Sequence, residues 1–393
     1  MMRDIPLSQQ TRCTEREKSD MNKRKRIHPV FLLLFALIAV AVTIPVCRWI
    51  RSAPLVQKYP AFSDHYGYGS PEFDTFVKAS YDELRLADFQ EFYQWMDLAY
   101  EKWKKQGETN GTYPFPAAES SDLKGLCAAV EKQRSLQQDT GELAGMEMSC
   151  ARGVHRMVKS VIPRFSLQRG YEFTSVPRYG ERQCFLQSVL IAGLFQLMDM
   201  KAGLVMVYRN EKGEESNNGH AVVLLRLSDG HDIIVDASEP RPFATHKGLF
   251  CNDYRGNRYV KPVFVSGSEM IAGYQQESDD EPIERETIGA LDITFINSQF
   301  DVYRGEWVNG SLHSGRKSRQ GLESAVRYFR RSVNTCRNNP AAVYMLARAL
   351  EELNNNDEAR RQFRKACELY SECGWFYKGQ KEKMKKYSIQ PAL

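Results

Sequence analysis

The chain has 393 residues, enough for roughly two or three domains with substantial hydrophobic cores. Its 42% hydrophobic residues exclude a mostly disordered chain, and its 26% charged residues exclude a polytopic membrane protein. Residues 1–26 carry eight Lys or Arg against four acidic residues, so this tail holds +4 of the net charge of +5. The remainder is nearly neutral, and we therefore expect no nucleic-acid binding.

The first predicted element is a membrane anchor. Residues 30–46, VFLLLFALIAVAVTIPV, form 17 uncharged residues, close to the roughly 20 that are needed to cross a bilayer. The basic run KRKR precedes them, so the positive-inside rule assigns residues 1–28 to a cytoplasmic tail and 29–50 to a transmembrane signal anchor. The bulk of the chain is then extracytoplasmic, in the periplasm or at the cell surface if the source is bacterial. A cleaved signal peptide is the alternative, but no A-x-A-like site follows the apolar run.

Helices and then short strands are predicted for the middle of the chain. Residues 51–143 are expected to form a stalk followed by a helical region. The prolines and glycines of residues 51–70 indicate the stalk, and apolar residues that recur at spacings of three and four indicate the helices. The predicted helices cover residues 71–80, 84–106, 122–135, 144–162 and 184–198. The predicted strands cover residues 203–210, 220–227, 231–238 and 258–265. The acidic stretch 275–286 is expected to be a solvated loop.

The C-terminal part contains a repeat with a period of 34 residues. The pattern Ala-x3-Phe-x2-Ser of residues 325–332 recurs as Ala-x3-Phe-x2-Ala in residues 359–366. This pattern resembles the tetratricopeptide repeat, in which paired helices place small residues where they cross. We therefore expect residues 305–393 to form an all-α array of tetratricopeptide-like hairpins that binds a protein partner. A generic helical hairpin is the alternative.

The cysteines do not form a metal or redox motif. Nine are present, and no C-x-x-C pair occurs, so neither a zinc ribbon nor a thioredoxin-type site is indicated. An extracytoplasmic location permits disulfides, and an odd number leaves at least one thiol free. Seven cysteines lie beyond the apolar run and its edge: Cys127, Cys150, Cys184, Cys251, Cys336, Cys367 and Cys373.

Cys184 lies where a polar loop meets the most apolar of the predicted helices. The unpaired N–H groups and the positive dipole end at a helix N-terminus favour an anion, which is the reactive form of a thiol. The same N–H groups provide a start for an oxyanion site. Position alone also fits a cysteine that only packs in the core, or one half of a disulfide.

His220 and Asp236 lie on two adjacent predicted strands. A three-residue turn at Ser228–Gly230 places Leu227 opposite His231, so facing positions sum to 458 and Asp236 faces Val222. His220 and Asp236 then lie diagonally on one face, roughly 7–8 Å apart at the backbone, within reach of an imidazole and a carboxylate. Such a carboxylate fixes the imidazole tautomer and stabilises the imidazolium.

The other two histidines of this region, His231 at the hairpin tip and His246 in a later loop, are expected at the surface.

The order and spacing of these residues resemble the transglutaminase-like superfamily. Cys184 begins a helix, a Gly-His-Ala strand follows 36 residues later, and Val-Asp-Ala-Ser comes 16 residues after that. The resemblance covers roughly residues 145–265 and implies an α+β, papain-like core in which the nucleophile helix packs on an antiparallel sheet. It assigns Cys184 as nucleophile, His220 as general base and acid, and Asp236 as the residue that orients the histidine. Residues 144–300 would form this catalytic domain.

The residues immediately before the cysteine depart from that family. A small residue is usual within two positions of the nucleophile, whereas Glu181, Arg182 and Gln183 stand here. Long side chains at these positions could narrow access to the thiol. The side-chain donor of the oxyanion site is not assigned by the sequence, and Tyr171, Tyr179 and Gln183 are candidates.

Taken together, the patterns predict a membrane-anchored cysteine acyl-transfer enzyme. Cys184 would attack a carboxamide or peptide carbonyl, and the thioester would be resolved by water or by an amine, so hydrolysis and transamidation both remain open. No cofactor and no metal ion are expected, and the substrate is a protein or peptide. The alternative is an inactive scaffold that works with its repeats as a protein-interaction module.

Overall fold

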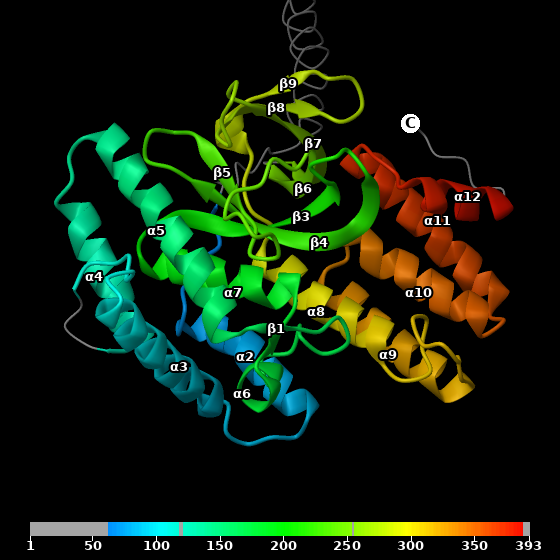
Figure 1. Cartoon of the computed structure of the whole chain (residues 1–393). Helices are drawn as coiled ribbons and strands as arrows, with labels where there is room; N and C mark the ends of the chain where they lie inside the picture. Colours follow the sequence, from blue (N-terminus) through cyan, green and yellow to red (C-terminus); the bar gives the residue numbers. More distant parts are fainter. Residues whose placement is uncertain (1–61, 118–120, 254, 388–393) are drawn as a thin grey trace, which may run out of the picture. The chain divides into compact units, whose positions relative to one another are not determined.

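The structure is a computed structural model that describes residues 62–117, 121–253 and 255–387, all of which belong to one compact unit of the chain (Figure 1). The tail 1–28 and the anchor 29–50 lie outside the described residues, so their predicted roles stay predictions. Within the part of the chain that is described, no helix is both long enough and apolar enough to span a bilayer.

Helices account for about half of the described residues, and several of them begin with a capping side chain. Ser70 precedes the first of them and accepts a hydrogen bond from the Phe73 N–H, while Asp122 and Asp139 cap later helices in the same way. The helices before the barrel are α2 (Pro71–Glu83), α3 (Gln90–Thr109), α4 (Leu123–Ser135), α5 (Thr140–Val161), α6 (Ser175–Tyr179) and α7 (Cys184–Leu197). Those after it are α8 (Ile293–Trp307), α9 (Arg319–Thr335), α10 (Pro340–Glu352), α11 (Asn356–Cys373) and α12 (Lys378–Lys386).

Six antiparallel strands form a closed barrel. They follow the order β5-β4-β3-β6-β7-β8, and the pairing of Asp232 with Ile271 joins β5 to β8 and closes the sheet. The barrel strands are β3 (Lys201–Arg209), β4 (Glu215–Arg226), β5 (Asp232–Val235), β6 (Gly248–Asp253), β7 (Gly256–Phe264) and β8 (Ile271–Gln276). Outside it lie β9 (Pro282–Ile283), which pairs with β8, a 3-10 turn at Arg285–Thr287, and the short parallel pair β1 (Arg164–Phe165) and β2 (Glu181–Arg182).

The closed barrel corrects the predicted fold class. The papain-like, transglutaminase-like core expected from the resemblance, a nucleophile helix on an antiparallel sheet, is wrong as a description of this architecture. The physical reason is that the strands are apolar on both faces. On β3, Val205 and Val207 belong to a cluster inside the barrel, while Leu204 and Met206 belong to the larger core outside it. A sheet that is apolar on both faces must be shielded from water on both, and closing the sheet into a barrel buries its inner face.

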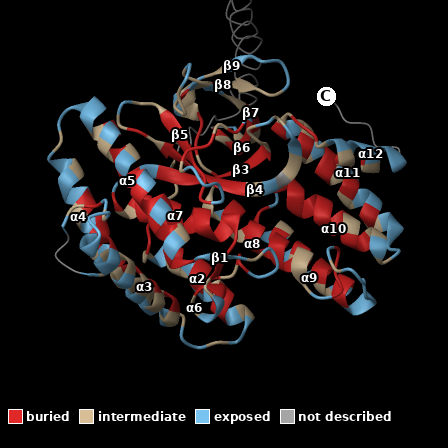
Figure 2. Ribbon diagram, viewed as in Figure 1, coloured by how far each residue is buried: buried red, intermediate tan, exposed pale blue. Residues whose placement is uncertain are grey.

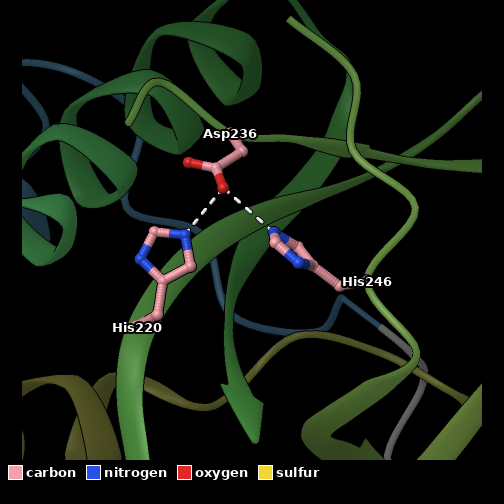
Figure 3. A group of neighbouring side chains, drawn as sticks. All are labelled: His220, Asp236 and His246. Carbon is pink, nitrogen blue, oxygen red and sulfur yellow. Dashed lines mark hydrogen bonds and ion pairs between the residues drawn. The ribbon is translucent and has the colours of Figure 1, made fainter. Parts of the chain in front are cut away.

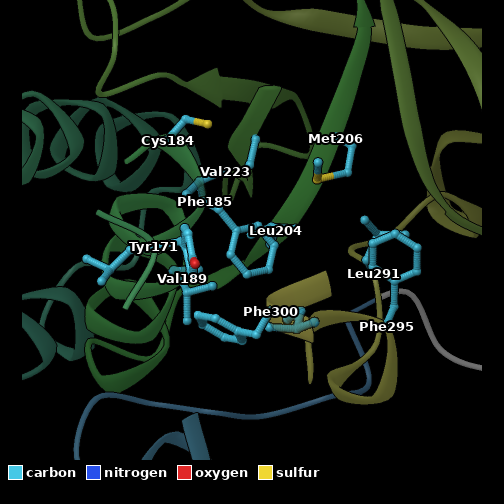
Figure 4. Packing of buried hydrophobic residues seen from close by; sticks show 14 of the residues in the cluster. Tyr171, Cys184, Phe185, Val189, Leu204, Met206, Val223, Leu291, Phe295 and Phe300 are labelled. Carbon is cyan, nitrogen blue, oxygen red and sulfur yellow. The ribbon is translucent and has the colours of Figure 1, made fainter. Parts of the chain in front are cut away.

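Helix α7 covers part of the outer face and forms the centre of the larger core. It is buried along almost its whole length and packs on β3 and β4 (Figure 2). Helix α8 crosses nearby, and the Phe300 ring contacts the Phe185 ring edge-on at a centroid distance of 4.9 Å. Figure 4 shows Cys184 at the end of this packed layer, next to Phe185 and above the apolar side chains of β3. The fold therefore supports the start of α7 on rigid neighbours.

The C-terminal helices pack in chain order, α8 on α9, α9 on α10 and α10 on α11. Helix α11 also contacts β7 of the barrel, and Trp375, between α11 and α12, packs its ring on Tyr208 and Tyr259 at centroid distances of 4.5 and 4.9 Å. One further element differs from expectation: the acidic stretch 275–286 contains the end of β8, a turn, β9 and the 3-10 turn rather than one loop. The domain boundaries drawn from the sequence stay predictions.

Candidate functional site

Cys184 is the first residue of α7. Gln183 precedes the helix in an extended conformation, with φ −128° and ψ 165°, and its side chain does not cap the helix. The free N–H groups of the first turn therefore remain available to an anion near the sulfur. Cys184 itself is only 5% exposed. The thiol is thus at a helix N-terminus, as predicted, and access to it is narrow.

The β4–β5 hairpin has the register that the sequence predicts. Val223 faces Val235 and Arg226 faces Asp232, so facing positions sum to 458, and the Leu227 N–H donates to the His231 carbonyl across the turn at 2.8 Å. This register brings His220 and Asp236 together on one face of the barrel.

His220 and Asp236 form a short hydrogen bond. Nε2 of His220 lies 2.7 Å from Oδ2 of Asp236, which is fully buried and also accepts from the Ser238 N–H through Oδ1 at 2.9 Å. An ionised carboxylate only accepts, so Nε2 carries the proton and Nδ1 is left free to accept one. Cys184 lies near enough to this imidazole to contribute to raising its pKa. The structure therefore brings all three predicted residues together, and their catalytic roles stay a proposal.

The electrostatics of the site favour an imidazolium next to a carboxylate. Burial disfavours charge on His220, but the bonds to Asp236 and the neighbouring Cys184 outweigh burial and raise the pKa of His220 to about 10. Burial likewise disfavours the Asp236 carboxylate, yet the two imidazoles that donate to it hold its pKa well below the usual range. This arrangement stabilises the ion pair that forms when a thiol gives its proton to histidine.

His246 is the second imidazole, and the sequence reasoning missed it. It was expected at the surface but is buried, and its Nε2 lies 3.0 Å from Oδ2 of Asp236. Figure 3 shows both imidazoles directed at this carboxylate. The place of this second imidazole follows from strand order: on β3, Val207 pairs with His220 on one side and with Leu249 of β6 on the other. The segment just before β6 therefore lies next to His220. Only the pairing of β6 with β3 could have revealed this.

His220, Asp236 and His246 together offer a possible set of metal ligands. A tetrahedral zinc ion with bonds of about 2.0–2.1 Å would separate its ligand atoms by about 3.3 Å. The observed nitrogen–oxygen distances of 2.7 and 3.0 Å are shorter than this and are those of hydrogen bonds. The donor set therefore fits a hydrogen-bonded carboxylate between two imidazoles better than it fits a metal ion.

The long side chains before Cys184 bond to the upstream loop. Glu181 forms a two-point ion pair with Arg169 at 2.7 and 2.9 Å, and Arg182 donates to the Ile162 carbonyl at 2.9 Å. Burial lowers the pKa of Arg182. These contacts hold the strand pair β1–β2 together and so position the approach to the thiol.

The three candidates for the side-chain oxyanion donor have different environments. Tyr179 is 41% exposed and lies under the Arg169 guanidinium, and Tyr171 stacks on Tyr303 of α8 at 5.5 Å. Gln183 is buried, and its Oε1 has no hydrogen-bond partner in the described part of the chain. Tyr303 was not among the candidates. Burial raises the pKa of its hydroxyl, to which a charge on Cys184 adds, and its ring packs on that of Phe185, the residue after Cys184, at 5.2 Å.

Comparison with known proteins adds no relative to this picture. No family model matches the chain, and no curated protein matches it. A solved structure described as menin, with its binding site for Mixed Lineage Leukemia protein, aligns over 79% of this chain and 73% of that chain. The identity is 12% and the TM-score 0.26, so this likeness carries no argument. The chemistry of the site rests on its own residues.

Proposed function

We propose that the protein is a cysteine acyl-transfer enzyme acting on peptide or carboxamide bonds. The observation that carries the proposal is a cysteine at a helix N-terminus near an imidazole that a buried carboxylate holds by a hydrogen bond of 2.7 Å. A nucleophile, a base and an orienting group in this order are the components of nucleophilic catalysis. The order of Cys, His and Asp along the chain adds support from the sequence.

The reaction follows from the positions of the protons. Nδ1 of His220 accepts the thiol proton, and the thiolate attacks the carbonyl carbon, forming a C–S bond while the carbonyl oxygen takes the negative charge. The free N–H groups at the start of α7 stabilise that oxygen. The imidazolium then protonates the departing amine, leaving a thioester at Cys184. Water yields an acid, whereas a second amine yields a new amide, and both regenerate the thiol.

Alkylation of Cys184 by iodoacetamide, followed by mass spectrometry of peptides, tests the proposal. The seven cysteines in the described residues are all free and buried, so the other six serve as internal controls. At neutral pH Cys184 is expected to react faster than the others, and His220→Ala should remove this advantage. If Cys184 reacts no faster than in the urea-unfolded chain, the nucleophile assignment is wrong.

The membrane anchor and the location outside the cytoplasm remain sequence-based proposals. The scaffold alternative makes a different prediction from the enzyme: Cys184→Ala would then leave the protein's biological role unchanged, with a partner retained by residues 305–393.

A further inference from the structure

A cavity of about 450 Å³ lies beside the Cys184 centre. One wall contains Gln183 and Gly219, the chain neighbours of Cys184 and His220. The volume lies in the lower part of the range for small-ligand sites, about 300–1,000 Å³. The opposite wall comes from α8, α10 and α12 and includes Tyr303, Glu306, Trp307, Tyr344, Arg348 and Gln380.

Buried contacts fix these walls relative to the nucleophile. The Tyr303 ring packs on Phe185 at 5.2 Å, and the next residue, Arg304, forms ion pairs with Glu172 at 2.6 Å and with Asp301 at 3.0 Å. On the other side, Asn217 of β4 accepts hydrogen bonds from the Tyr370 hydroxyl and the Gln380 amide. The same strand carries His220 three residues later, so β4 positions both the cavity wall and the histidine of the Cys184 centre.

Two buried polar atoms in the cavity wall, Tyr303 Oη and Gln183 Oε1, make no hydrogen bond of ordinary geometry among the described residues, although the Gln299 side chain lies near the hydroxyl. A buried donor or acceptor without a partner is unfavourable, so a ligand that pairs with it gains affinity. The hydroxyl can donate and the amide oxygen can only accept. A peptide group offers the complementary pair, a carbonyl acceptor and an N–H donor. The two atoms therefore offer a peptide group one donor and one acceptor in the cavity wall.

The cavity also contains two opposite charges that are not paired with each other. Within the described residues, neither Glu306 nor Arg348 forms a hydrogen bond or ion pair through its side chain, although both line the same space. Burial raises the pKa of Glu306 to about 7 in spite of the nearby Arg348 charge. Both residues are partly exposed, and a charge held partly out of water is favoured by a partner of opposite sign. A ligand with one cationic and one anionic end would supply both partners.

We propose that this cavity binds a short peptide with both ends free. Tyr303 and Gln183 bind the peptide group that is presented to Cys184, Glu306 binds the terminal ammonium, and Arg348 binds the terminal carboxylate. This inference rests on the proposed acyl-transfer function and names its substrate class. Arg348 suits its role because a guanidinium binds a carboxylate through two parallel hydrogen bonds.

Calorimetric titration of the full-length Cys184→Ala protein measures binding without turnover. The probes are Ala-Ala-Ala with free ends, its N-acetyl form and its C-terminal amide. Each blocked form should bind about tenfold or more weakly, the effect of losing a hydrogen bond to a charged group. Arg348→Gln should abolish the preference for the free acid only, and Glu306→Gln the preference for the free amine only. Tyr303→Phe should weaken the three peptides equally.

Arg361→Gln and Glu372→Gln are matched controls, because both residues are exposed on α11 and do not line the cavity. They should leave all three affinities unchanged. Equal binding of free and blocked peptides, or no binding of any of them at millimolar concentration, overturns the inference. A failure of the proposed acyl-transfer function gives a different result. The free tripeptide then binds with the expected preferences, but the protein with Cys184 intact does not cleave it.

Discussion

Two aspartates of one strand region, Asp232 and Asp236, are fully buried four residues apart but have different partners. Asp232 begins β5 and accepts from the Arg226 guanidinium at 2.8 and 3.0 Å and from the Tyr274 hydroxyl at 2.7 Å. Asp236 follows the end of β5 and accepts from two imidazoles. An arginine keeps its charge under all ordinary conditions, whereas an imidazole can release and accept a proton near neutral pH.

The partners explain what each carboxylate does. The Asp232 contacts join β4, β5 and β8 at the point where the barrel closes, so they stabilise a fixed structure. The Asp236 contacts end at His220, whose side chain is 26% exposed and lies near Cys184. A buried carboxylate next to an imidazole with partial access to solvent can support proton transfer. The same residue type thus has a structural role at one end of β5 and a proposed chemical role at the other.

The largest expected effect is the loss of acyl-transfer activity in Asp236→Asn. The amide keeps the volume but does not stabilise an imidazolium, so the acyl-transfer rate should fall by about 10³- to 10⁴-fold. Release of p-nitrophenolate from p-nitrophenyl acetate, per folded molecule, measures it. Asp232→Asn is the paired control and should leave this rate within a few-fold of the wild type. Similar losses in both variants would contradict the division of roles.

The next largest effect is a lower free energy of unfolding in Asp232→Asn. Loss of the carboxylate leaves the Arg226 guanidinium buried without its counter-charge, which should lower the free energy of unfolding by about 3–5 kcal/mol. Urea denaturation followed by circular dichroism measures the change. Asp229→Asn at the hairpin tip is the control and should stay within about 0.5 kcal/mol of the wild type. An equally small change in Asp232→Asn would show that the barrel closure does not depend on this pair.

The pH dependence of stability should separate the two aspartates further. The pKa of His220 is raised to about 10 by its bonds to Asp236 and Cys184, although burial opposes this. The stabilisation is therefore complete below the unfolded histidine pKa of about 6.5 and is lost as the pH rises towards 10. The free energy of unfolding should fall across this window, by at most about 1.4 kcal/mol per pH unit. His220→Asn should reduce the fall, and an equal fall in this variant would contradict the contribution of His220.

The local part of the site could be predicted from the sequence, but its long-range part could not. The turn at Ser228–Gly230 fixes the hairpin register, and that register brings His220 and Asp236 together. Barrel closure depends instead on one pairing between Asp232 and Ile271, and β8 is a short strand with a glycine and two glutamines that carries little apolar periodicity. His246 was missed for the same reason, because its neighbours depend on the position of β6 beside β3.

His246→Leu tests how much the second imidazole contributes and should have the smallest effect. Leucine fills the buried space but removes the 3.0 Å hydrogen bond to Asp236, at a cost of about 1.5 kcal/mol in unfolding free energy. With one donor fewer, the pKa of Asp236 should rise towards its unfolded value. A carboxylate with a lowered pKa stabilises the folded state until the pH falls to that pKa, so in this variant the loss of stability in acid should begin at a higher pH. Asn at position 246 keeps a donor and should restore part of both effects. An unchanged acid limb in His246→Leu would mean that His220 alone sets the charge of Asp236.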